Sequence, residues 1–128
     1  ASGGVKRFAI ANPEHAPYGK AAEAALRANG LWHQIQPALV RGENIAQAAQ
    51  FATAGGAAGG ILAYSLALTP AVGNLGRYVV LPEALHPALK QRMVLLKRAS
   101  PAAEQFYRYL QGDAARAILR ANGFAVPQ

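Results

Sequence analysis

The sequence predicts an α/β fold in which a mostly parallel sheet carries helices on both faces. Short apolar runs of strand length alternate with segments whose apolar residues recur at helical spacing. Glycine, proline and asparagine separate these runs and indicate turns between them. Strands that alternate with helices in this way are typical of parallel sheets. A chain of 128 residues has the length of one domain, so residues 1–128 are expected to form a single α/β lobe.

The first four elements have clear local signals. Residues 8–11 form an apolar run that predicts a strand, and the helix expected over residues 18–29 begins after Pro17 and stops at Gly30. A short strand is expected at residues 39–40. Asn44 is the expected N-cap of a helix from Ile45 to about Thr53, which Gly55 and Gly56 end.

Later elements complete the expected lobe. Strands are predicted at residues 60–63, 78–81 and 93–96, so the core βαβ units span residues 5–81 and a hinge-like return strand lies within residues 82–98. A helix pair fills residues 99–128. Its helices run from Pro101 to Leu110, capped by Ser100, and from Asp113 to Ala121, capped by Asp113 and stopped at Asn122-Gly123. The pair is expected to bury one apolar side: Phe106, Leu110, Ile118 and Leu119.

Composition excludes several classes of protein. Apolar residues make up 52% of the chain and charged residues 15%, which excludes general disorder. The chain has no cysteine, a fact compatible with both periplasm and cytoplasm. Its net charge of +7 is scattered, and aromatic residues do not interleave with basic ones as they do in nucleic-acid-binding modules. Binding of nucleic acid is therefore not expected.

No catalytic constellation is visible either. The three histidines, His15, His33 and His86, have no second ligand at metal spacing, and His15 reads as a loop histidine that bonds locally. No nucleophile elbow, general acid/base pair or Walker-type phosphate loop is present. We therefore expect no enzyme activity, no cofactor and no bound metal cation.

Two predicted helix starts carry the functional signal. One is Pro17-Tyr18-Gly19 and the other is Asn44-Ile45-Ala46; each follows a predicted strand. The carboxyl ends of parallel strands share one edge, where ligands of open α/β sheets bind. N–H groups at helix starts attract anions. Alternatively, both are ordinary capped helices that face water, an interpretation that spacing alone favours.

The chain resembles the periplasmic molybdate-binding proteins of molybdate ABC transporters along nearly its whole length. The matching segments are RFAIANPEHAPYG (7–19), AAEAALRANGLW (21–32), VRGENIAQAAQFATAGGAAGGILAYS (40–65), YVVLPEALHPALKQRMVLL (78–96) and AAEQFYRYLQGDAARAILRANGFAVP (102–127). The resemblance implies one lobe of a type II periplasmic binding protein. It also implies capture of a tetrahedral oxyanion, molybdate or tungstate, for an ABC importer permease in the periplasm.

By position, the resemblance assigns the oxyanion-donating N–H groups to Tyr18 and Ile45, with Asn44 beside them. Many relatives also use a tyrosine hydroxyl from the segment that matches residues 60–65. Aligned on Gly60-Ile61, that position is Ala63 here, and the neighbouring Tyr64 is the candidate. One step along a strand turns a side chain to the other face, so Tyr64 departs from the family pattern.

The resemblance covers only the second lobe and the C-terminal segment of that family. We expect a truncated half of a two-lobed protein, in which residues 93–96 form an unpaired hinge strand that invites self-association. Two alternatives are an effector-sensing domain of a LysR-type regulator and a basic nucleic-acid-binding fragment. An upstream helix-turn-helix would favour the first, and a steep salt dependence of binding would favour the second.

Overall fold

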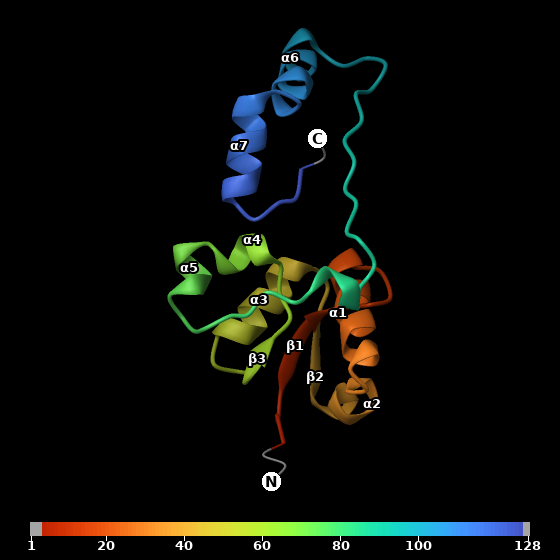
Figure 1. Cartoon of the computed structure of the whole chain (residues 1–128), viewed down its shortest axis with the longest axis vertical. Helices are drawn as coiled ribbons and strands as arrows, with labels where there is room; N and C mark the ends of the chain where they lie inside the picture. The colour runs from red at the N-terminus through yellow and green to blue at the C-terminus, as the bar shows by residue number, and fades with distance from the viewer. Residues whose placement is uncertain (1–3, 127–128) are drawn as a thin grey trace. The chain divides into compact units, whose positions relative to one another are not determined.

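The computed structural model describes residues 4–126, which contain a parallel sheet of three strands (Figure 1). The strands are β1 (Phe8–Ala11), β2 (Leu39–Gly42) and β3 (Gly59–Gly60). Their order is β2-β1-β3, so β1 is central. Phe8 pairs with Leu39 on one side and with Gly59 on the other. The parallel α/β fold predicted from the sequence is thereby confirmed.

Two helices cover opposite faces of this sheet: α1 (Pro17–Ala28) and α3 (Ile45–Thr53) (Figure 1). Successive side chains of a strand point to opposite faces. Ile10 is therefore buried with Ala22 and Leu26 of α1, whereas Ala11 is buried with Ala48 of α3. The expectation of helices on both faces of the sheet holds.

The chain divides into two compact units between Leu89 and Lys90. Within the described residues, the first unit also contains five short helices, and the second contains a helix pair. In the first they are α2 (Trp32–Ile35), η1 (Gln36–Ala38), α4 (Tyr64–Ala67), α5 (Pro70–Gly73) and η2 (Glu83–Leu85); in the second, α6 (Pro101–Leu110) and α7 (Asp113–Ala121). Within residues 4–126, no helix has the length and apolarity needed to cross a membrane.

Most helix boundaries agree with the sequence-based expectations. Gly30, Gly55 and Gly123 have φ values of +67°, +75° and +82°, so each ends its helix in the left-handed conformation that glycine favours. Ser100 caps α6 by accepting a hydrogen bond from the Ala103 N–H at 3.2 Å. The expected Asp113 cap is wrong: Gly112 is the N-cap of α7, and Asp113 lies in the first turn.

Three predicted strands need correction. The strand expected at residues 60–63 ends at Gly60, because the chain turns into α4 directly after Ala63. Residues 78–81 and 93–96 form no strand in the described part of the chain, and Val79 and Val94 are 90% and 78% exposed. An apolar run becomes a strand only where a partner completes its backbone ladder.

The helix pair of the second unit buries less than expected. Phe106 and Ile118 are 61% and 55% exposed, so the predicted shared apolar side is wrong for these two residues. Leu110 and Leu119 are partly buried, and Ala115 is the buried residue of α7. Two short helices alone cannot enclose large side chains on every side.

Candidate functional site

The carboxyl ends of β1 and β2 form a topological switch point. The loop after β1 leads to α1 on one face of the sheet, and the loop after β2 leads to α3 on the other. Loops that leave neighbouring strands toward opposite faces open a crevice where α/β proteins bind ligands. The Asn12 N–H donates a 2.7 Å hydrogen bond to the Gly42 carbonyl oxygen and ties the two strand ends together.

The start of α1 leaves two backbone donors free. Its N-cap, Ala16, has no side-chain acceptor, and Pro17 at the first helical position has no N–H. The first intrahelical bond is donated by Lys20 to the Ala16 carbonyl oxygen at 3.0 Å. Among residues 4–126, the N–H groups of Tyr18 and Gly19 have no hydrogen-bond partner.

Close packing places this helix start directly on the end of β1. A Cβ atom on Gly19 would collide with the Ala11 carbonyl oxygen and would lie 2.6 Å from the carbonyl carbon of Asn12. Gly19 is accordingly buried. Only a residue without a side chain lets the helix backbone approach the strand this closely.

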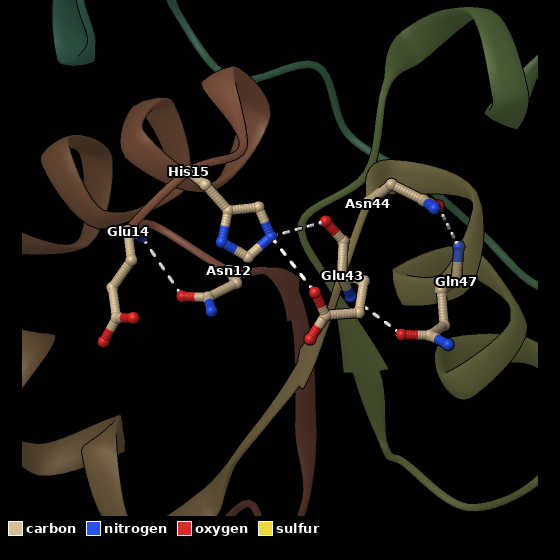
Figure 2. A network of polar contacts seen from close by, with 6 residues as sticks. All are labelled: Asn12, Glu14, His15, Glu43, Asn44 and Gln47. Carbon is tan, nitrogen blue, oxygen red and sulfur yellow. Dashed lines mark hydrogen bonds and ion pairs between the residues drawn. The ribbon is translucent and has the colours of Figure 1, made fainter.

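The start of α3 is built differently. The Asn44 Oδ1 accepts a 2.9 Å hydrogen bond from the Gln47 N–H, and the Gln47 Oε1 accepts a 2.7 Å bond from the Glu43 N–H (Figure 2). The reciprocal bonds resemble a capping box and confirm Asn44 as the N-cap. Within the described residues, the N–H groups of Ile45 and Ala46 remain without a partner.

A second glycine brings α3 close to β2. A Cβ atom on Gly42 would lie 2.6 Å from the Ala48 backbone nitrogen and 3.0 Å from the Asn44 carbonyl oxygen. Each strand–helix junction of the site therefore contains one glycine where backbone meets backbone.

The structure brings two of the predicted site residues together and leaves a third aside. Tyr18 and Ile45 both pack against the small buried cluster of Ala11, Ala16 and Ala48. Two helix starts from opposite faces of the sheet thus share one apolar base. The N–H groups of Tyr18 and Ile45, which have no partner within the described residues, lie at these two starts.

Tyr64 is not among the side chains packed on that cluster. It begins α4, is 40% exposed, and its ring lies 5.9 Å from the ring of Tyr78 at a tilt of 57°. The neighbouring Ala63 is buried, so the one-residue offset noted in the sequence separates a covered position from an open one. Asn44 uses its side chain for the helix cap.

The structure also joins two residues that sequence reasoning did not connect. The His15 Nε2 lies 2.9 Å from the Glu43 carbonyl oxygen and 3.3 Å from the Glu43 Oε2 (Figure 2). The expectation that His15 bonds locally is wrong, because its partner is 28 residues away. The two loops that carry the helix starts are therefore linked by side chains as well as by backbone.

The chemistry offered here is that of neutral, directional donors. Four backbone N–H groups lie at two helix starts, where the helix dipoles add partial positive charge. No group of three or more possible metal-ligating side chains exists among residues 4–126. Such a site suits an anion with several acceptor oxygens.

Comparison with known proteins identifies relatives of this chain. The family model described as bacterial extracellular solute-binding protein matches residues 1–125. The molybdate-binding proteins ModA of Rhodobacter capsulatus and Azotobacter vinelandii are 34% and 35% identical over 94% of this chain, and that of Escherichia coli is 31% identical. The chain spans about half the length of these relatives, 47%, 49% and 46% respectively.

Solved structures give the same relationship. The periplasmic molybdate-binding protein of Azotobacter vinelandii superposes with a TM-score of 0.87 at 30% identity, covering 98% of this chain and 56% of that one. A substrate-binding domain from Clostridium difficile, with a TM-score of 0.72 at 20% identity, shares the fold.

The resemblance inferred from the quoted segments is thus confirmed, together with the α/β lobe and the periplasmic setting that it implied. The family match extends along nearly the whole chain and includes both helix starts of the site. The chain belongs to the family of bacterial extracellular solute-binding proteins.

Proposed function

We propose that this chain supplies one side of an oxyanion-binding site in the substrate-binding component of an ABC importer, with molybdate or tungstate as ligand. The observation that carries the proposal is the pair of helix starts at one switch point. Tyr18 and Ile45, whose N–H groups are free within the described residues, pack on a single apolar cluster. The names of the relatives supply the ligand class.

Binding of this kind needs no chemical step and no cofactor. Backbone N–H groups select an anion by its size and by the directions of its oxygen atoms. Molybdate and tungstate are tetrahedral dianions, so each presents several acceptors to donors that converge from two helices. The family match favours this function over a LysR-type effector domain and over nucleic-acid binding.

The relatives are about twice as long as this chain, and the two helix starts can contact only one side of a tetrahedral anion. We therefore infer that further donors come from the portion of the family that this chain does not match. The permease of the importer would be the partner of the complete protein. This chain alone should bind the anion weakly, because the anion stays partly hydrated.

Titration of the chain with molybdate, tungstate, sulfate and phosphate tests the proposal. Backbone amide NMR signals of Tyr18, Gly19, Ile45 and Ala46 should shift with molybdate and tungstate, and calorimetry should give similar affinities for the two. Smaller responses are expected from sulfate and phosphate. Molybdate shifts confined to other residues, or no response to any of the four anions, would reject the site.

We also propose that the second unit self-associates. Residues 93–96 line a groove of about 430 Å³ together with Phe106 and Leu110 of α6, and Leu96 is 74% exposed. Exposed apolar segments of extended backbone pair readily with other chains. Light scattering should report dimers or larger species, which Val94→Lys combined with Leu96→Lys should dissociate. Ala102→Lys, at an exposed position of α6, is the matched control. A wild-type chain that is monomeric at high concentration would contradict the proposal.

A further inference from the structure

The geometry points to His15 as a positioning residue that holds the two helix starts at a fixed separation. This inference rests on the proposed function and deepens it. Within the described residues, the His15 side chain is bonded to Glu43 and to neither Tyr18 nor Ile45, so it acts on the donors through Glu43. It is also the histidine whose sequence context predicted only a local bond.

The contact between His15 and Glu43 acts as a clamp, which joins the two loops close to their donors. Tyr18 lies three residues after His15, and Ile45 lies two residues after Glu43. The loop of residues 12–16 and the loop of residues 43–44 come from neighbouring strands and lead to helices on opposite faces. Each donor therefore lies close to the clamp residue of its own loop. A change in the distance between the two loops changes the distance between the donors.

The pairing of β1 with β2 and the shared packing on the alanine cluster leave the two loops without a polar link beyond the strand ends. The Asn12 N–H···O bond to Gly42 fixes the strand ends, but the loops continue beyond it. The His15 contact lies farther along both loops and supplies a second point of attachment (Figure 2). A polar link beyond the strand ends resists a hinge motion of the loops that strand pairing alone allows.

The Glu43 carbonyl oxygen determines what the side chain at position 15 must provide. A carbonyl oxygen accepts only, so the His15 Nε2 must carry the proton for the 2.9 Å contact to be a hydrogen bond. The Glu43 carboxylate, 3.3 Å away, accepts as well and favours that proton position. A glutamine side chain can bring an amide N–H to nearly the same place, whereas alanine cannot.

Holding the donors in place before the ligand arrives lowers the ordering cost of binding. A looser pair of helix starts would have to be ordered by the anion itself. The expected consequence is weaker binding with an unchanged set of donors. Loss of the clamp should therefore reduce affinity without reducing the number of amide signals that respond to molybdate.

Three variants of the chain test this inference: His15→Ala, His15→Gln and the control His33→Ala. His33 is exposed in α2 and makes no side-chain hydrogen bond to another described residue. Amide hydrogen exchange of Asn12 reports the junction of the two strands without any ligand. In His15→Ala it should quicken about tenfold, as expected for loss of one hydrogen bond, while His15→Gln should restore most of the protection.

Affinity for molybdate gives the second readout. His15→Ala should bind about five- to tenfold more weakly, and His15→Gln and His33→Ala should lie within about twofold of wild type. Unchanged Asn12 exchange in His15→Ala would overturn the clamp, whether or not the wild-type chain binds an anion. Unchanged affinity in His15→Ala, with wild type binding, would overturn its effect on the donors. If the wild-type chain binds no anion, the proposed function fails, and exchange alone decides the clamp.

Discussion

The two helix starts at the sheet edge reach the same result by opposite means. In α1 a proline occupies the first helical position, and the N-cap Ala16 has no side-chain acceptor. In α3 the N-cap Asn44 binds the N–H of Gln47, the third helical residue. The first helical residue of α1 thus has no N–H to donate. In α3 the N–H of the third helical residue is already bonded to the cap.

Each helix is left with two adjacent free donors within the described residues. They are Tyr18 and Gly19 in α1, and Ile45 and Ala46 in α3. The first four N–H groups of a helix have no intrahelical partner. Proline in α1 and the asparagine cap in α3 each remove one of these donors in a different way, and this difference makes the two starts separately testable.

The largest effect is expected where the helix backbones meet the strands. Gly19→Ala and Gly42→Ala would each force a Cβ atom against backbone atoms that cannot move away independently. We expect each to lower the free energy of unfolding by about 3 kcal/mol, as overpacking does at its upper range. Thermal melting by circular dichroism measures the loss. Gly76→Ala, where no atom lies within 4 Å of the new Cβ, should change little.

If one of the two substitutions were as harmless as Gly76→Ala, the corresponding helix start would not be held against its strand. The comparison would then favour the other helix as the fixed part of the site. Equal losses would indicate that both junctions are rigid.

The next effect concerns the Ile45 N–H alone. Ile45→Pro removes this donor at a first helical position, which accepts proline because Asn44 before it is extended at φ −146° and ψ 176°. Losing one charge-assisted hydrogen bond should weaken molybdate binding by about 1.5–3 kcal/mol, or roughly ten- to a hundredfold. Calorimetry measures the change.

Ile45→Ala is the matched control, because it shortens the same side chain and keeps the N–H. Ile45 packs on the alanine cluster, so both variants lose some packing. Only a larger loss of affinity in the proline variant supports the donor. Equal affinities of a folded Ile45→Pro and Ile45→Ala would remove Ile45 from the site.

Both helix starts could be predicted from the sequence because their signals are local. Pro17 and Asn44 each stand within one residue of the helix that they begin. The strand predicted at residues 78–81 failed for the opposite reason. Its composition favours extended backbone, but a strand also needs a partner that its own residues do not specify.

The side-chain arrangement of the site was harder to predict. The link from His15 to Glu43 spans 28 residues and depends on the order of β1 and β2 in the sheet. Tyr64 was expected next to a strand over residues 60–63, but β3 ends at Gly60 and Tyr64 begins α4. Both outcomes follow from three-dimensional topology, which spacing along the chain does not reveal.

A smaller effect is expected from the cap of α3. Asn44→Ala removes the acceptor for the Gln47 N–H and should cost about 1 kcal/mol of stability, the usual value for an N-cap. The two donors before Gln47 are untouched, so molybdate affinity should fall by less than it does in Ile45→Pro. Thermal melting beside calorimetry separates the two effects. Gln50→Ala, an exposed change in the same helix, is the control.

Ala16→Ser should produce the smallest change in stability and a sharper change in binding. Ala16 is the N-cap of α1 with φ −90° and ψ 125°, a conformation in which a serine Oγ accepts from the second or third helical N–H. Those groups belong to Tyr18 and Gly19, the proposed donors. We expect about 0.5 kcal/mol of added stability, since the new bond is offset by burial of the hydroxyl. Molybdate affinity should fall about threefold to tenfold, because the serine competes with the anion. Ala16→Gly offers no acceptor, so it should not combine a gain in stability with a loss of affinity. A more stable Ala16→Ser with undiminished affinity would show that α1 donates nothing to the ligand.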